Sequence, residues 1–173
     1  MALTLSDFAL IAEIISAFAI VVSLVFVGFQ LKDNAKATRS ATANATISTI
    51  CAWYSTMGQN EQASAMFFNG MENPAAFSRE QWFQFVFGLH ALMLVFQNSY
   101  YLGVEGTLNY EIRDSLTAVI AAAKDQPGFV RYWAQRRAIF LPEFQAYVDS
   151  LAAPDVVSSE GLYRHVGPDE APP

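Results

Sequence analysis

The sequence has little charge and almost no cysteine. Charged residues make up 15% of its 173 residues, against about 25% in an average soluble protein. The single cysteine, Cys51, excludes an internal disulfide and any metal site built from several cysteines. The formal net charge of -6 argues against nucleic-acid binding, which requires clustered Lys and Arg. We therefore expect no nucleic-acid partner.

Residues that commonly catalyse reactions or bind metals are also scarce. His90 has no Glu or His three or four positions away, so the spacing of helical metal ligands is missing and a hydrogen-bonded core histidine is favoured. His165 lies in a polar segment, where we expect it to be solvated. Glu105, Glu111 and Asp114 more often cap and solvate a helix start than bind a cation. We expect no cofactor and no enzymatic activity, because a hydrolase or metalloenzyme would require His90 and acidic side chains to meet in space.

Apolar side chains are abundant. Hydrophobic residues make up 53% of the chain, and 14 Phe, 7 Tyr and 3 Trp provide the bulk for a core. The mean hydropathy of +0.24 is high for a water-soluble domain. So few charges cannot cover this much apolar surface, and part of it should face lipid or another protein.

The most apolar segment is Phe8–Leu31, in which only Glu13 and Gln30 are strongly polar. A hydrocarbon core of about 30 Å requires roughly 20 helical residues, so this segment is long enough to cross it. Twelve residues of Ile14–Leu31 are Ile, Leu, Val or Phe, and together they outweigh one carboxylate near the helix end. The pattern predicts a transmembrane anchor over residues 1–31, with a buried core helix of a soluble protein as the alternative.

The charges on either side of this segment indicate its orientation. The first residues lack the positive charges of a signal peptide, and Asp7 has the opposite sign, which disfavours a cleaved signal. Lys32, Lys36 and Arg39 follow the segment directly. The positive-inside rule therefore predicts a single-pass protein whose C-terminal domain lies in the cytoplasm.

Small residues recur within the segment at spacings of four, three and four. These spacings place them on one helix face, where a second helix can approach closely. The alternative is that these residues have no specific role in association, because Ala and Ser are common in membrane helices. The predicted helix-association face consists of Ala12, Ser16, Ala19 and Ser23.

Residues 32–152 are predicted to form a small helical bundle. No Pro or Gly occurs between Leu31 and Gly58, so the anchor helix should continue into the aqueous phase, with a possible bend near Asp33–Asn34. The pattern Ser78-Arg79-Glu80-Gln81 has the form of a capping box, and Thr107 is the expected cap of a later helix. The predicted helices are Glu61–Asn69, Arg79–Leu102, Leu108–Lys124, Phe129–Phe140 and Pro142–Ala152. Residues 153–173 hold four of the seven prolines and should form an irregular tail.

The second apolar run, Phe83–Phe96, is short for a membrane span. It is more typical of a central core helix, and a second membrane-embedded segment is the alternative. Polar residues elsewhere in the bundle predict either an interhelical network or contact with lipid headgroups. Arg136 and Arg137 could pair with the acids Glu105, Glu111 and Asp114. The full set of candidates is Arg131, Arg136, Arg137, Glu143, Asn98 and Tyr101.

Three stretches carry a resemblance to a known family: FVGFQLKDNAKATRSAT, FQNSYYLGVEGTL and YWAQRRAIFLPEFQAYVD. Through them the chain resembles a widespread uncharacterised bacterial family over Phe8–Asp149, with Gln30, Asn34–Arg39 and Trp133–Phe144 the most distinctive parts. The resemblance implies an N-terminal membrane helix followed by a small helical domain, located at the bacterial inner membrane. It implies no activity.

The sequence as a whole predicts an all-α protein, with an N-terminal transmembrane helix continuing into a small helical bundle. We expect a non-enzymatic, membrane-anchored interaction module that contacts membrane lipid. It would either self-associate as a homo-oligomer or be an accessory subunit bound to other membrane protein subunits. The alternative is a sensory domain that binds a small apolar ligand.

Overall fold

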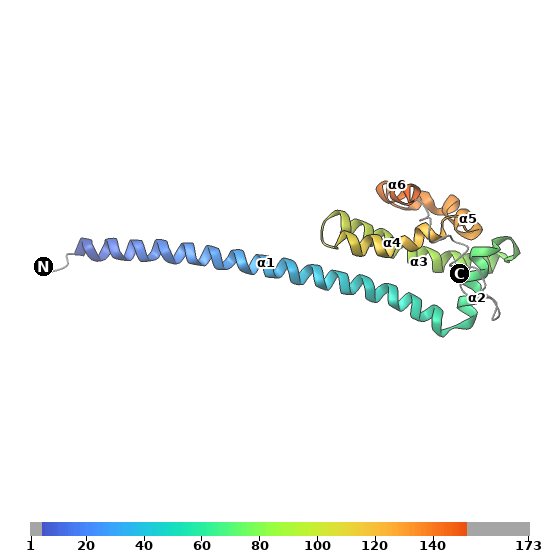
Figure 1. Ribbon diagram of the computed structural model, residues 1–173, viewed down its shortest axis with the longest axis horizontal. Helices are drawn as coiled ribbons and strands as arrows, with labels where there is room; N and C mark the ends of the chain where they lie inside the picture. Colours follow the sequence, from blue (N-terminus) through green and yellow to red (C-terminus); the bar gives the residue numbers. More distant parts are fainter. Residues whose placement is uncertain (1–4, 152–173) are drawn as a thin grey trace, which may run out of the picture. The chain divides into compact units, whose positions relative to one another are not determined.

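The computed structural model describes residues 5–151, apart from the side chains of Ser6 and Asp7 (Figure 1). These residues form six α-helices and two short 3-10 helices, and none of them is in a strand, so the predicted all-α class is confirmed. The expected tail, with His165, lies outside the described residues. The α-helices are α1 (Leu5–Gln59), α2 (Glu61–Glu72), α3 (Arg79–Val104), α4 (Tyr110–Ala123), α5 (Pro127–Arg136) and α6 (Pro142–Ser150).

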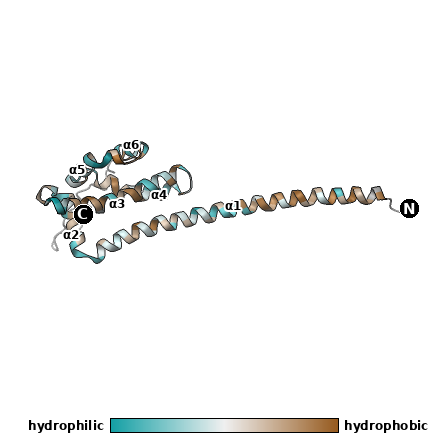
Figure 2. Ribbon diagram, turned by 180° about the vertical axis from the view of Figure 1, so that it is seen from behind, coloured by the Kyte–Doolittle hydropathy of each residue, from teal (hydrophilic) through white to brown (hydrophobic). Residues whose placement is uncertain are grey.

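The chain divides into two compact units, residues 1–41 and 42–173, and the boundary falls within α1. The described part of the first unit is helix alone. The helix passes Asp33 and Asn34 without a break, as expected where Pro is absent. Figure 2 shows that the apolar colouring of α1 is concentrated toward its N-terminus, and that the later part of the helix is more polar. The second unit contains the remainder of α1 and the bundle.

Local side-chain chemistry explains where α3 begins. The Gln81 backbone N–H donates to the Ser78 hydroxyl at 3.3 Å, and the Ser78 N–H donates to the Gln81 side-chain oxygen at 2.8 Å. This reciprocal pair is the predicted capping box, which is confirmed.

The start of α4 differs from the prediction. The cap is Asn109, whose side-chain oxygen accepts from the Glu111 N–H at 2.7 Å, and the helix begins at Tyr110. Thr107 was the wrong choice because its N–H, like that of Leu108, bonds back to the Leu102 carbonyl at 2.9 Å. These bonds close the end of α3, and Gly106 makes the turn with φ of 73°.

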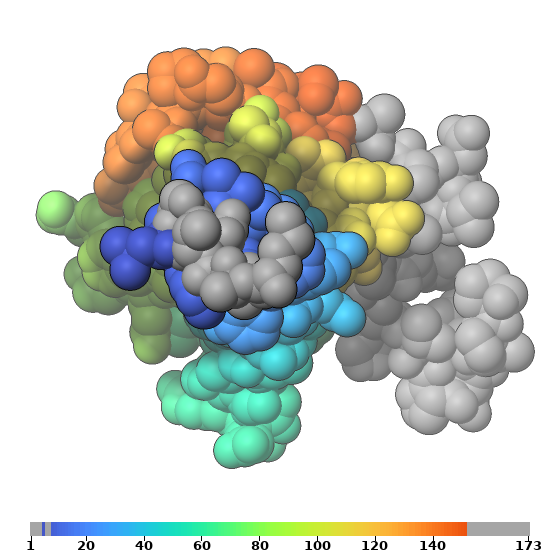
Figure 3. Space-filling model, turned by 90° about the vertical axis from the view of Figure 1, so that its left-hand side faces the viewer, coloured from blue at the N-terminus to red at the C-terminus, as the bar shows by residue number. Residues whose placement is uncertain are grey.

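Prolines begin the last two α-helices. Pro127 and Pro142 each lie in the first turn of their helix. Backbone N–H groups there have no acceptor within the helix, so the missing N–H of proline costs no hydrogen bond. The segment predicted as one helix over Phe129–Phe140 is split into α5 and the 3-10 helix Arg137–Ile139. Figure 3 shows α5 and α6, in orange, along one side of the bundle.

Helix α3 supplies the centre of the bundle. One face is buried, including Phe85, Leu89 and Phe96, and it packs with side chains of the other helices in a single apolar cluster. The opposite face is exposed, with Phe87 65% and Leu94 45% accessible. The run Phe83–Phe96 therefore forms a core helix on one face. By length and composition, α3 also remains apolar enough to cross a membrane.

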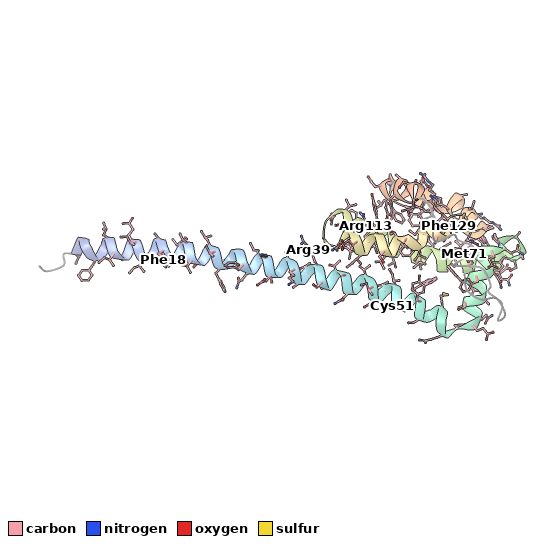
Figure 4. The ribbon with its side chains drawn as sticks, in the orientation of Figure 1. Phe18, Arg39, Cys51, Met71, Arg113 and Phe129 are labelled. Carbon is pink, nitrogen blue, oxygen red and sulfur yellow. The ribbon has the colours of Figure 1, made fainter. Side chains whose placement is uncertain are left out.

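Helices α2 and α5 meet at two glycines. A Cβ on Gly128 would lie 2.0 Å from the Gly70 carbonyl oxygen, so the backbones are in direct contact. A Cβ on Gly70 would lie 2.4 Å from the Phe85 ring. The neighbouring side chains of Met71 and Phe129 are both buried in the core cluster (Figure 4). The absence of a side chain at Gly128 allows α2 and α5 to cross this closely, and its absence at Gly70 leaves room for the Phe85 ring of α3.

Candidate functional site

The N-terminal part of α1 exposes a continuous apolar surface. Every residue of Phe8–Leu31 is exposed, including Phe18 at 71% and Leu24 at 67% (Figure 4). The most apolar window of this helix has a mean hydropathy of 2.7. Leaving a large apolar side chain in water rather than burying it costs about 1.5–3 kcal/mol. The segment is a candidate membrane span by length and composition, a test that a signal sequence or a soluble core helix can also pass.

The predicted association face lies within this exposed stretch. Ala12, Ser16, Ala19 and Ser23 are all exposed on α1. The Ser16 hydroxyl donates to the Ala12 carbonyl at 2.8 Å, so it is satisfied within its own helix. The face can therefore contact lipid or a second helix without leaving that hydroxyl unpaired.

Arg131 joins neighbouring elements of the bundle. Arg131 donates from Nη1 to the Pro74 carbonyl at 3.0 Å, and its guanidinium lies 4.2 Å from the Trp82 ring centroid. It therefore connects α5 to the 3-10 helix Pro74–Ala76 and to α3, by a hydrogen bond and a cation–π contact.

Arg137, the first residue of the 3-10 helix after α5, contacts α6. Its Nε and Nη2 atoms donate to Asp149 at 2.9 and 2.5 Å, and Nη1 donates to Gln145 at 2.5 Å. The expected pairing of Arg137 with Glu105, Glu111 or Asp114 is therefore wrong. Asp114 instead pairs with Arg113, at 2.7 Å. Arg113 and Asp114 pair because they are neighbours on α4. Arg137 pairs with Asp149 because the chain turns between α5 and α6.

Three further polar candidates are Asn98, Tyr101 and Glu143. Asn98 is exposed and borders a groove of about 390 Å³ beside Thr46. The Tyr101 hydroxyl bonds to Glu105 at the end of the same helix, which raises the pKa of Tyr101. Glu143 is exposed in the first turn of α6. The six polar candidates do not form one network.

His90 makes the predicted hydrogen bond, but it is half-buried beside the core rather than buried within it. Its Nδ1 lies 2.8 Å from the Tyr132 hydroxyl, and its ring packs 5.2 Å from that of Phe140. Burial lowers the pKa of His90, and the nearby Arg136 charge lowers it further. Burial also raises the pKa of Tyr132. Both groups are therefore neutral at pH 7, as an interior contact requires. Across residues 5–151, no three His, Cys, Asp or Glu side chains gather in a metal-binding group.

Asp149, Trp133 and Lys124 help to hold α6 in place and were not predicted from the sequence. Asp149 accepts from the Trp133 indole at 2.8 Å as well as from Arg137. Lys124 donates from Nζ to the carbonyls of Val148 at 3.4 Å and Asp149 at 3.1 Å, and also to that of Leu151. One signal was available: an acid near a helix C-terminus opposes the helix dipole, so Asp149 required a cationic partner.

Comparison with family models, curated proteins and solved structures finds no match to this chain. Its function must therefore be argued from its own geometry.

Asp149→Asn should lower the stability of the bundle. Hydrogen bonds from Arg137 and then Trp133 lower the pKa of Asp149. A lowered pKa stabilises the fold above the unfolded value of about 3.9, and this contribution is lost as the pH falls through the folded value. We expect a lower midpoint of thermal unfolding at pH 7, and a difference from the unaltered protein that shrinks below pH of about 4. Circular dichroism melts at several pH values measure both.

Asp125→Asn is the matched control, because Asp125 is an exposed carboxylate in the turn between α4 and α5. An equal loss in both variants at pH 7 would show that the pairing of Asp149 contributes nothing specific.

Proposed function

We propose that this protein is a non-enzymatic interaction module held in the bacterial inner membrane by one helix. The observation that carries the proposal is the apolar N-terminal part of α1, in which every residue of Phe8–Leu31 is exposed. On the insertion scale, the twelve Ile, Leu, Val and Phe residues of Ile14–Leu31 contribute roughly -4 to -7 kcal/mol in favour of the membrane. Glu13 lies toward the end of the segment, where its cost is smaller.

The basic residues that follow support a cytoplasmic bundle. Lys32, Lys36 and Arg39 are exposed on α1 directly after the apolar stretch, and Figure 4 shows the position of Arg39. Cations in this position favour the cytoplasmic side during insertion and can contact anionic headgroups. The module would therefore be single-pass, with its bundle in the cytoplasm.

The surface of the bundle supports a role in binding other proteins. Large apolar side chains are exposed on several helices, including Val104 at 62% and Ile139 at 58%. Scattered apolar residues are normal on soluble proteins, but this chain has few charges to separate them. Self-association or a place in a larger membrane complex would cover part of this surface.

Association should depend on the small-residue face of the anchor. Ser16→Leu combined with Ser23→Leu would keep a second helix from approaching closely, and we expect association to weaken by roughly tenfold. Mass measurement of the detergent-solubilised protein across a concentration series gives the assembly state. Ile14→Leu with Val21→Leu is the matched control, because these residues have the same spacing of seven but lie on the opposite helix face.

A strictly monomeric, partnerless species from the unaltered protein would count against the interaction module. Equal weakening by the serine pair and by the control pair would exclude the small-residue face as the contact.

A further inference from the structure

The bundle contains an apolar hollow between four helices. Its volume is about 220 Å³, and its walls include Trp53, Tyr54 and Met57 of α1, Phe67 of α2, Leu92 of α3 and Val119 of α4. All of these residues belong to the second compact unit. The hollow opens to the surface, where the side chain of Tyr54 is 48% exposed. A small molecule can therefore reach it from solution, and a concave, mainly apolar space of this kind is typical of small-molecule sites.

The chemistry of the walls limits what that occupant can be. Among the residues that the structure describes, those lining the hollow carry no charged side chain. The Trp53 indole N–H donates to the Gly88 carbonyl at 3.3 Å, and the Ser64 hydroxyl donates to the Met57 carbonyl. These two polar groups are used within the fold, so apart from the Tyr54 hydroxyl the hollow offers mainly apolar contact. A carboxylate or phosphate would lose its hydration there without gaining a cationic partner.

Ring-to-ring contacts fix the aromatic wall. The Trp53 ring lies 5.0 Å from that of Phe67 at 77° and 5.3 Å from that of Tyr54 at 87°, centroid to centroid. Phe67 in turn lies 5.8 Å from Phe85 of the core. Edge-to-face pairs of this kind hold one another in place. The wall is therefore formed before any ligand arrives, which reduces the entropy cost of binding.

We propose that this hollow is a binding site for a small, uncharged molecule that carries one aromatic ring or a hydrocarbon group of similar size. An apolar cavity of about 150 Å³ admits benzene, and this hollow is larger. The site is separate from the membrane anchor, and it gives the bundle a ligand-binding capacity in addition to protein contacts.

Toluene titrated into the full-length, detergent-solubilised protein tests the site. Methionines carrying ¹³C-labelled methyl groups report binding residue by residue, because Met57 lines the hollow whereas Met71 and Met93 are buried in the core cluster. We expect a saturable shift of the Met57 signal from the ring current of the ligand, and little change at the other two. Equal, non-saturating shifts at all three would overturn the proposal.

Two substitutions of Ser64 distinguish the effect of filling the hollow from the effect of losing the Ser64–Met57 hydrogen bond. Ser64→Ala and Ser64→Leu both remove the bond to Met57, but only leucine adds bulk to the space. We expect Ser64→Leu to weaken toluene binding by about tenfold or more, and Ser64→Ala to stay within about threefold of the unaltered protein. Val119→Leu fills the hollow from a different helix, so the test stands if Ser64→Leu fails to fold.

Similar binding by both filling variants and Ser64→Ala would place toluene elsewhere and overturn the site. Tetramethylammonium is the second probe, because aromatic faces also attract cations. A saturable shift of Met57 with tetramethylammonium and none with toluene would overturn the assignment to an uncharged ligand. None of these outcomes depends on whether α1 crosses a membrane, so failure of the ligand site would leave the proposed anchor standing.

Discussion

Phe18→Lys combined with Val21→Lys is expected to abolish recovery of the full-length protein from the membrane fraction. Each lysine at the centre of a spanning helix costs about 2.5–3.5 kcal/mol on the insertion scale, so two cost roughly 5–7 kcal/mol. That cost is about equal to the whole favourable contribution of the apolar residues of Ile14–Leu31. Phe18 and Val21 both lie near the middle of the exposed apolar stretch of α1. Alkaline extraction of membranes, followed by detection of the full-length chain in pellet and supernatant, measures the effect.

Ala37→Lys with Ser40→Lys is the control. It adds the same two charges at the same spacing on the same helix, but outside the apolar stretch, beside Lys36 and Arg39. We expect this variant to stay in the membrane pellet, because added positive charge at that position agrees with the proposed orientation.

Two results would contradict the membrane anchor. The first is recovery of the unaltered protein without detergent as a soluble, full-length monomer. The second is an intact mass from which the N-terminal residues are missing, which would identify the segment as a cleaved signal. The double lysine variant alone would not separate these cases, so the intact mass is measured in parallel.

Local signals in the sequence were sufficient to place most helices. The start of α3 was predictable because the Ser78 and Gln81 side chains bond to backbone groups only three residues away. The start of α4 was not, because Thr107 and Asn109 are both suitable cap residues. The choice between them depends on how the end of α3 closes through the Leu102 carbonyl and Gly106. Which of two suitable residues caps a helix is therefore decided by how the preceding helix ends.

Pairings between helices were less accessible from the sequence. Charge and spacing identified Arg137 as a residue in need of a partner, but not that the partner would be Asp149. Arg131 contacts the Pro74 carbonyl and the Trp82 ring, neither of which carries a charge. Such contacts depend on the angles at which helices cross, and the identities of the residues do not determine those angles. The apolar hollow was inaccessible for the same reason, because its walls come from four helices.

Gly128 is another residue whose role depends on how two helices cross. The helix predicted over Phe129–Phe140 begins after Gly128, yet Pro127 and Gly128 both lie in the first turn of α5. A Cβ at residue 128 would lie 2.0 Å from the Gly70 carbonyl oxygen and 2.7 Å from the Met71 Cα. Both of these atoms belong to the backbone, so no side chain can rotate out of the way, and α2 and α5 would have to separate.

Gly128→Ala is therefore expected to destabilise the bundle by about 3 kcal/mol or more, at the upper end of the usual cost of overpacking. This is a large share of the roughly 5–15 kcal/mol that stabilises a typical domain. Gly88→Ala provides the control, because it lies inside α3 and a Cβ there meets nothing within 4 Å. Alanine has the higher helix propensity, so Gly88→Ala should stabilise by about 0.5–1 kcal/mol. Chemical denaturation followed by tryptophan fluorescence gives both values, and the two variants should differ in sign. If Gly128→Ala unfolds at the same denaturant concentration as the unaltered protein, α2 and α5 do not cross at these glycines.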